Sequence, residues 1–194
     1  LTVSAYSNKN IENYKSPYLG KKFSNDEILS VLKKDNYKNK ISYEIIDDKK
    51  LFDLSAKIIS EGNIIGWFQD KMEFGPRALG NRSILADPTN PDMKDIINKK
   101  IKRRESFRPF APVTLKEFQN EWFESKFLSQ YMSSLSIVKK DKQKIIPAIT
   151  HVDGTARVQI VEKSTNFKLA TLIESFKKIT NVPVLLNTSF NENE

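Results

Sequence analysis

The sequence of 194 residues contains no cysteine and a single histidine, His151. The absence of cysteine excludes a disulfide framework and a thiol nucleophile, and one histidine does not make a self-contained multi-histidine metal site. No stretch of about 18 apolar residues could span a bilayer, and no basic region precedes an apolar one as in a secretory signal. We therefore expect a cytoplasmic protein with no membrane partner and no metal ligands of its own.

Two nucleotide-binding loops, GxxxxGK[ST] and GxGxxG, are also missing. Positive charge, by contrast, is abundant, because 32 Lys and Arg against 24 Asp and Glu give a formal net charge of +8. This excess indicates an anionic partner, which on charge alone could be a nucleotide, a nucleic acid or an acidic membrane surface. A nucleotide would have to be held by basic side chains in place of such a loop.

The apolar pattern predicts strands and helices mixed along one hydrophobic core. Short β-branched or alternating runs predict strands at 41–46, 63–69 (buried), 83–86, 134–138, 156–161 and 183–186. The segment 109–115 looks extended, because its two prolines bias the residues before them away from the helical conformation. Capping residues such as Ser24, Asp47 and Asn90, followed by helical spacing, predict helices carrying the apolar residues of 28–32, 51–59, 93–101, 118–123 and 169–179. The expected fold class is α/β, of the mixed α+β kind.

Arginines collect in segments that also carry glycine or proline. The segment 71–83 sets Arg77 and Arg82 among two glycines and a proline, which suits the capture of an anion and equally suits a turn with surface arginines. The run 99–108 places positive charge at a helix end, where part of it offsets the helix dipole. Arg108 leads from this run into an extended, proline-rich path, so we expect its side chain to be buried against a partner or a ligand.

Two further segments carry polar groups around strands. The segment 151–157 places His151 and Arg157 on either side of a turn glycine; an isolated histidine is more often structural than a general base, so Arg157 is the better ligand candidate. Residues 187–191 read as a loop beyond the carboxyl end of the strand 183–186, where open α/β sheets bind ligands. An ordinary polar turn explains that last segment as well.

Four motifs in order resemble the O-carbamoyltransferase family, which includes nodulation protein U and antibiotic-tailoring carbamoyltransferases. They are Met72 to Pro88 (MEFGPRALGNRSILADP), Phe107 to Pro112 (FRPFAP), His151 to Arg157 (HVDGTAR) and Leu186 to Asn191 (LNTSFN). Ser16 to Gly20 is similar to the junction between the two domains of that family. The resemblance implies a linker at 1–23, which follows an N-terminal domain of actin-like ATPase fold, and a YrdC-like domain at 24–194 with a twisted open sheet flanked by helices.

The resemblance also implies a reaction and a set of site residues. The YrdC-like domain would bind ATP, with Mg2+ on its phosphates, and carbamoyl phosphate, and would form carbamoyl adenylate for transfer to a hydroxyl acceptor in the N-terminal domain. Arg77, Lys102 and Arg108 are similar to the residues that hold carbamoyl phosphate and act in catalysis. Arg157, Ser189 and Asn187 resemble the set that contacts ATP. Since the chain starts at Leu1 and stops at Glu194 just after a motif, we expect a fragment that is truncated at its C-terminus.

Two alternatives remain open. A YrdC-like RNA-binding module would explain the basic charge, but the sequence lacks the interleaved stacking aromatics of single-strand binders, which argues against a nucleic-acid partner. A threonylcarbamoyl-adenylate synthase would share the fold and the adenylating chemistry, but the Gly75 to Gly80 motif argues against it.

Overall fold

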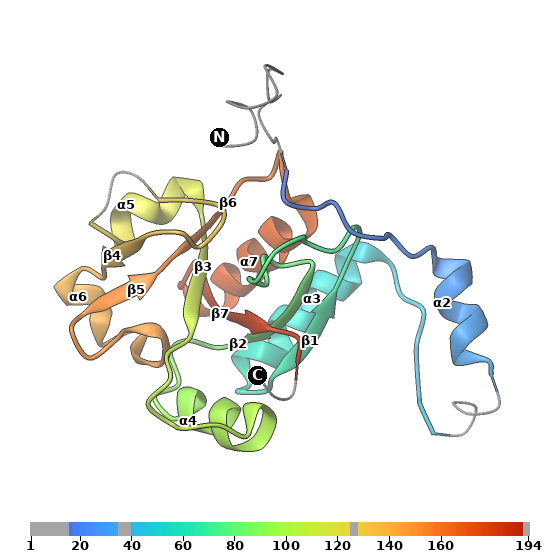
Figure 1. The fold of residues 1–194 in the computed structure, drawn as a ribbon, viewed down its shortest axis with the longest axis horizontal. Coiled ribbons are helices and arrows are strands. Elements are labelled where there is room, and N and C mark those ends of the chain that lie inside the picture. Colours follow the sequence, from blue (N-terminus) through green and yellow to red (C-terminus); the bar gives the residue numbers. More distant parts are fainter. Residues whose placement is uncertain (1–15, 35–39, 125–127, 192–194) are drawn as a thin grey trace, which may run out of the picture.

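The computed structural model describes residues 16–34, 40–124 and 128–191 (Figure 1). Within these residues, five strands form a central sheet in the order β1, β2, β7, β3, β6, with the bounds Ile65–Phe68, Arg82–Ala86, Val184–Ser189, Ala111–Leu115 and Gln159–Val161. Neighbouring strands are antiparallel except for the parallel pair β3 and β6. A second sheet pairs β4 (Leu135–Ile137) with β5 (Thr155–Arg157).

Two long helices cover one face of the central sheet. α3 (Asp48–Ser60) and α7 (Phe167–Thr180) pack against each other (Figure 1), and their apolar residues join the main core. The shorter helical segments are α2 (Asn25–Leu32), α4 (Met93–Ile97), the π-helix η1 (Asn98–Lys102), the 3-10 helices η2 (Lys116–Phe118) and η3 (Pro147–Ile149), α5 (Gln119–Trp122) and α6 (Lys140–Gln143). The mixed α/β class, an open sheet flanked by helices, is confirmed.

Capping explains where several of these helices begin. Ser24 forms the capping box of α2 with Glu27, and the Asp47 side chain accepts from the Lys50 N–H at the start of α3. Both starts confirm the sequence-based prediction. The predicted cap at Asn90 is wrong, because α4 begins after Asp92 and the Asn90 side chain instead accepts from the Asp92 N–H in the preceding turn.

Three predicted elements differ in the structure. No strand forms at 41–46, where Ile45 is 75% exposed, since an alternating pattern becomes a strand only beside a pairing partner. β1 lies at the sheet edge and is not a buried strand, with Phe68 45% exposed. The single strand expected at 156–161 divides into β5 and β6, which join different sheets.

The most consequential difference concerns the last strand. Residues 187–189 are not a loop beyond a strand: they continue β7, whose Asn187 pairs with Ala111 of β3 while Ser189 pairs with Ser83 of β2. Polar residues can extend a strand when a neighbouring strand supplies backbone partners, and here pairing with β2 up to Ser189, and with β3 at Asn187, outweighs a local preference for turn. The polar end of β7 is therefore part of the sheet.

Two further expectations concern the domain boundary and membrane-spanning helices. Most of the linker predicted at 1–23 lies outside the described residues, and the boundary to a domain at 24–194 stays a prediction. No helix in the described ranges is long and apolar enough to cross a bilayer.

Candidate active site

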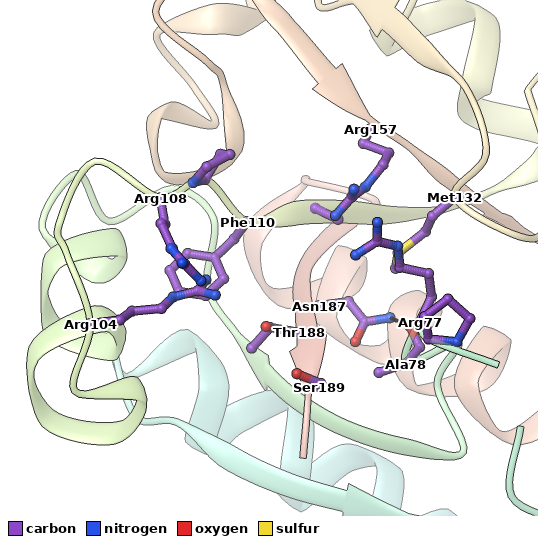
Figure 2. Close-up of a pocket in the computed structure, with 13 residues that line it drawn as sticks. Arg77, Ala78, Arg104, Arg108, Phe110, Met132, Arg157, Asn187, Thr188 and Ser189 are labelled. Carbon is purple, nitrogen blue, oxygen red and sulfur yellow. Dashed lines mark hydrogen bonds between the residues drawn. The ribbon is translucent and has the colours of Figure 1, made fainter. Parts of the chain in front are cut away.

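A cavity of about 250 Å³ opens where β7 meets the loops before β2 and β3 (Figure 2). Its lining includes four arginines from separate parts of the chain, together with residues of β7: Arg77, Arg104, Arg108, Arg157, Asn187, Thr188 and Ser189. Figure 2 shows Arg104 and Arg108 on one side of the β7 residues and Arg77 and Arg157 on the other. Among the described residues that line the cavity there is no carboxylate. Such a concentration of guanidinium groups favours an anionic ligand with several acceptor oxygens.

The arginines differ in how they are held. The Arg104 Nε donates to Asn98 Oδ1 at 2.8 Å, and its guanidinium lies 5.1 Å from the centre of the Phe110 ring. Arg108 forms an ion pair with Glu105, with 3.2 Å between Nε and Oε2, and its side chain is 42% exposed. The Arg108 guanidinium therefore stands at the cavity rim, where water reaches it, and its burial against a ligand or a partner stays a prediction. Arg104 and Arg108 thus form one positioned pair on the segment that leads into β3.

Lys102 has a different place from the other predicted residues. It is 1% exposed, and its Nζ donates to the Ser189 carbonyl at 2.7 Å and to the Asn191 Oδ1 at 2.7 Å, with further bonds to Ser189 Oγ and the Asn191 carbonyl. It does not belong to the lining of the cavity. The lysine holds the end of β7, on which Ser189 lines the cavity, and its predicted contact with carbamoyl phosphate stays a prediction.

The π-helix η1 explains how the basic run 99–108 supplies both a buried lysine, Lys102, and a cavity arginine, Arg104. A π-turn adds one residue to a helical turn and is found often at functional sites. η1 ends at Lys102, and Arg103 then takes a left-handed conformation with φ 48°. This combination buries Lys102 against β7 and brings Arg104 to the cavity two residues later. The helical spacing that predicts a helix here gives no signal for this change.

Glu73 organises the loop that carries Arg77. Its side chain is 7% exposed, and Oε1 accepts hydrogen bonds from the backbone N–H groups of Leu79, Asn81 and Arg82. A carboxylate that accepts several backbone N–H groups fixes a loop without regular secondary structure. Sequence reasoning missed Glu73, although a lone acid in a glycine-rich and arginine-rich loop is the signal that could have found it.

A buried amide network lies behind the same loop. The Gln69 side chain donates to Asn81 and Asn166, and Asn166 donates in turn to the Tyr18 hydroxyl. The Leu79 carbonyl accepts from both the Tyr18 hydroxyl and the Gln159 side chain. Because these residues are far apart in sequence, no local pattern reveals the network, which links the start of the described chain to the floor of the cavity.

Tyr18 gives this network a pH dependence. Burial raises the pKa of the Tyr18 hydroxyl from 10.0 to about 12. Between these pH values the unfolded chain releases the proton that the folded chain retains, so the free energy of unfolding should fall with rising pH, by up to about 1.4 kcal/mol per pH unit. Below pH 10 the contribution is fully present. Urea denaturation across this range should show the extra slope in the wild type and not in Tyr18→Phe; equal slopes would contradict it.

His151 lies outside the lining of the cavity. Its Nδ1 is 3.1 Å from the Thr155 hydroxyl, in the turn that leads into β5, and partial burial lowers its pKa despite the opposing charge of Asp153. The same turn positions Arg157 at the end of β5. The arrangement agrees with a structural role for His151.

Five of the six predicted site residues meet at one cavity: Arg77, Arg108, Arg157, Asn187 and Ser189. Residues 56–194 match the family model described as "Carbamoyltransferase C-terminus". The chain belongs to this carbamoyltransferase C-terminal family. The resemblance drawn from the four motifs is thereby confirmed, and the arginine cavity lies within the family domain.

Relatives of this carbamoyltransferase domain are longer proteins. An uncharacterized protein of Methanocaldococcus jannaschii is 44% identical over 181 residues, which are 93% of this chain and 30% of that protein. Nodulation protein NolNO of Sinorhizobium fredii is 50% identical over 142 residues, 72% of this chain and 21% of that protein. The crystal structure of full-length HypF in its phosphate- and nucleotide-bound form matches with a TM-score of 0.48 and 16% identity, covering 78% of this chain and 18% of HypF. The chain thus spans less than a third of each of them.

Proposed function

We propose that this carbamoyltransferase domain binds carbamoyl phosphate in the arginine cavity, adenylates its carbamoyl group with ATP, and supplies carbamoyl adenylate for transfer to a hydroxyl acceptor. The observation that carries the proposal is the convergence of Arg77, Arg104, Arg108 and Arg157 on one small cavity. Planar guanidinium groups match phosphate oxygens, which suits a reaction that brings two phosphorylated substrates together.

The size of the cavity indicates which parts of carbamoyl phosphate and ATP it can hold. At about 250 Å³ it is smaller than the roughly 300 to 1,000 Å³ typical of pockets for drug-sized ligands. A small anion such as carbamoyl phosphate fits within that volume, whereas a nucleotide would extend beyond it. In the proposal Arg77 and Arg108 hold carbamoyl phosphate, and the ATP phosphates enter between Arg157 and Ser189 with the adenosine outside.

The chemistry requires fixed cations and no nucleophilic side chain. Water cleaves carbamoyl phosphate to carbamate and inorganic phosphate; a carbamate oxygen then attacks the α-phosphorus of ATP, and the bond to the β-phosphate oxygen breaks to release pyrophosphate. Negative charge develops on the oxygens around phosphorus and on the leaving pyrophosphate. Arginines already positioned at those oxygens stabilise this charge without reorganising during the reaction.

Magnesium enters the proposal as part of the nucleotide. The described residues contain no group of three or more His, Asp or Glu side chains that could hold a metal ion, and the cavity lining offers guanidinium, amide and hydroxyl groups. Mg2+ is commonly bound largely by substrate phosphates and water. We therefore assign it to the ATP phosphates, as a component of the substrate.

The acceptor and the transfer step belong to the rest of a longer polypeptide in this proposal. The relatives extend well beyond the aligned region, which leaves room for a separate transferase domain. That domain is the proposed partner, and it would choose the acceptor hydroxyl. A cytoplasmic location, expected from the sequence, is part of the same proposal.

Calorimetric titration tests the nucleotide part of the proposal. ATP should bind saturably at physiological salt, more tightly with carbamoyl phosphate present, and Arg157→Ala should weaken ATP binding about 10- to 100-fold because one charge-assisted contact is lost. Lys163→Ala, which removes an exposed lysine that is paired with Glu174 away from the lining, is the matched charge control and should leave affinity unchanged. If ATP does not bind, and RNA binds with a steep salt dependence, the RNA-binding alternative replaces this one.

A further inference from the structure

One buried acceptor at the cavity has no hydrogen-bond partner among the residues that the structure describes. Asn187 is 1% exposed and lines the cavity, and its Oδ1 is shielded from solvent without a hydrogen bond. Leaving such an atom unsatisfied is unfavourable, since it has lost water and gained nothing in exchange. The four arginines of the lining are hydrogen-bond donors only, so a buried acceptor that is left unsatisfied beside them favours ligands that carry a donor of their own.

The orientation of this amide is fixed by its neighbours. Asn187 Nδ2 donates to the Ala78 carbonyl at 3.1 Å and to Gln159 Oε1 at 2.8 Å. The Ala78 carbonyl can only accept, and Gln159 is held because its own Nε2 donates to the Leu79 carbonyl at 2.8 Å. If the Asn187 amide were flipped, its Oδ1 would face the Ala78 carbonyl oxygen and Gln159 Oε1, and no hydrogen bond could form. Oδ1 therefore points away from these two acceptors. Figure 2 shows the Asn187 nitrogen turned toward Arg77 and Ala78 and the oxygen turned away from them.

We infer that Asn187 Oδ1 accepts a hydrogen bond from the amino group of the carbamoyl moiety and so selects a carbamoyl phosphate over an acyl phosphate. The inference rests on the proposed function and changes the role of Asn187 from contacting ATP to recognising the carbamoyl group. The arginines bind any small phosphorylated compound, because phosphate oxygens are common to all of them. Recognition of the carbamoyl group therefore needs an acceptor, and Asn187 supplies it.

Two stable phosphonates isolate this hydrogen bond. Phosphonoacetamide carries the amino group, and acetonylphosphonate replaces it with a methyl group of similar size while keeping the carbonyl and the phosphonate. A site built to bond an N–H rejects the analogue that lacks it, because the acceptor is then left buried and unpaired. Calorimetry with the wild-type protein should give a dissociation constant for phosphonoacetamide about 10- to 100-fold below that for acetonylphosphonate.

Two variants separate recognition from structure. Asn187→Leu should bring the ratio of the two dissociation constants close to one, whereas Ser189→Ala should change both constants alike and keep the ratio. If Asn187 serves only to hold Ala78 and Gln159, its replacement weakens both probes equally and the wild-type ratio persists, which overturns the inference. A wild-type ratio close to one would overturn the inference even if Asn187→Leu does not fold.

Titration with inorganic phosphate separates the inference about Asn187 from the proposed binding of carbamoyl phosphate in the arginine cavity. Equal binding of both phosphonates, with phosphate also bound, would leave the anion site in place and remove the role of Asn187. Absence of binding by all three compounds would overturn the proposed carbamoyl phosphate site, and the inference about Asn187 with it.

Discussion

Gly80→Ala is expected to lower the free energy of unfolding by about 2 to 5 kcal/mol. Gly80 has φ +97°, where a side chain strains the backbone by roughly 1 to 2 kcal/mol. An added Cβ would also collide with the Leu169 side chain, a fully buried part of α7, and overpacking of this kind costs about 1 to 3 kcal/mol more. Urea denaturation followed by circular dichroism measures the change.

Gly62→Ala is the matched control for this substitution. Gly62 has φ +85°, but nothing lies within 4 Å of the position that its Cβ would take. It should therefore show the backbone part alone, about 1 to 2 kcal/mol. If both variants lose the same free energy of unfolding, Leu169 moves aside for the new methyl group. That result would contradict close packing between α7 and the loop that carries Arg77 and Gly80.

Lys102→Met is expected to lower the free energy of unfolding by about 2 to 4 kcal/mol. Hydrogen bonds to a charged group contribute roughly 1.5 to 3 kcal/mol each, and the Lys102 ammonium donates to both Ser189 and Asn191. Part of the loss is offset, because methionine is buried without the desolvation of a charge. Since the end of β7 then loses its anchor, phosphate binding should weaken about 10-fold together with stability.

The stability measurement decides between two roles for Lys102. Lys100→Met, an exposed lysine on the same helix, should leave both quantities within the ordinary range for a surface substitution, about ±0.5 kcal/mol. If Lys102→Met loses phosphate binding while its urea midpoint matches that of the wild type, the lysine contacts the ligand directly and does not act by holding Ser189. That result would restore the role suggested by the family motifs.

The sequence predicts most of the anion site because its arginines stand out locally. Arg77 occurs in a glycine-rich loop and Arg157 beside a turn glycine, and both lie in motifs that resemble the family, whereas composition alone suits surface arginines equally well at Arg77. Arg104 lies in a basic run that the end of a helix also explains. Only the π-helix η1 accounts for Arg104 lining the cavity while Lys102 is buried against β7. A change of one residue in helical register leaves no trace in apolar spacing.

Elements whose stability comes from distant partners were the least predictable. Residues 187–189 look like a turn because amides and hydroxyls dominate, yet pairing with β2, and at Asn187 also with β3, makes them the end of a central strand. The opposite holds for 41–46, where alternation suggests a strand that has no partner in the described structure. Helices such as α3 and α7 were predicted well, because caps and apolar repeats act within a few residues.

The position of β7 governs when this domain can fold during synthesis. β7 comes last among the described strands but lies between β2 and β3, which are translated about 70 to 100 residues earlier. Until it leaves the ribosome, the inner edges of β2 and β3 have no shared partner, and the floor of the anion site does not exist. Long-range pairing of this kind slows folding, so the nascent chain exposes unpaired strand edges until translation has passed Ser189. We therefore expect chaperones that bind unpaired strand edges to bind a nascent chain that stalls before β7, at the exposed edges of β2 and β3.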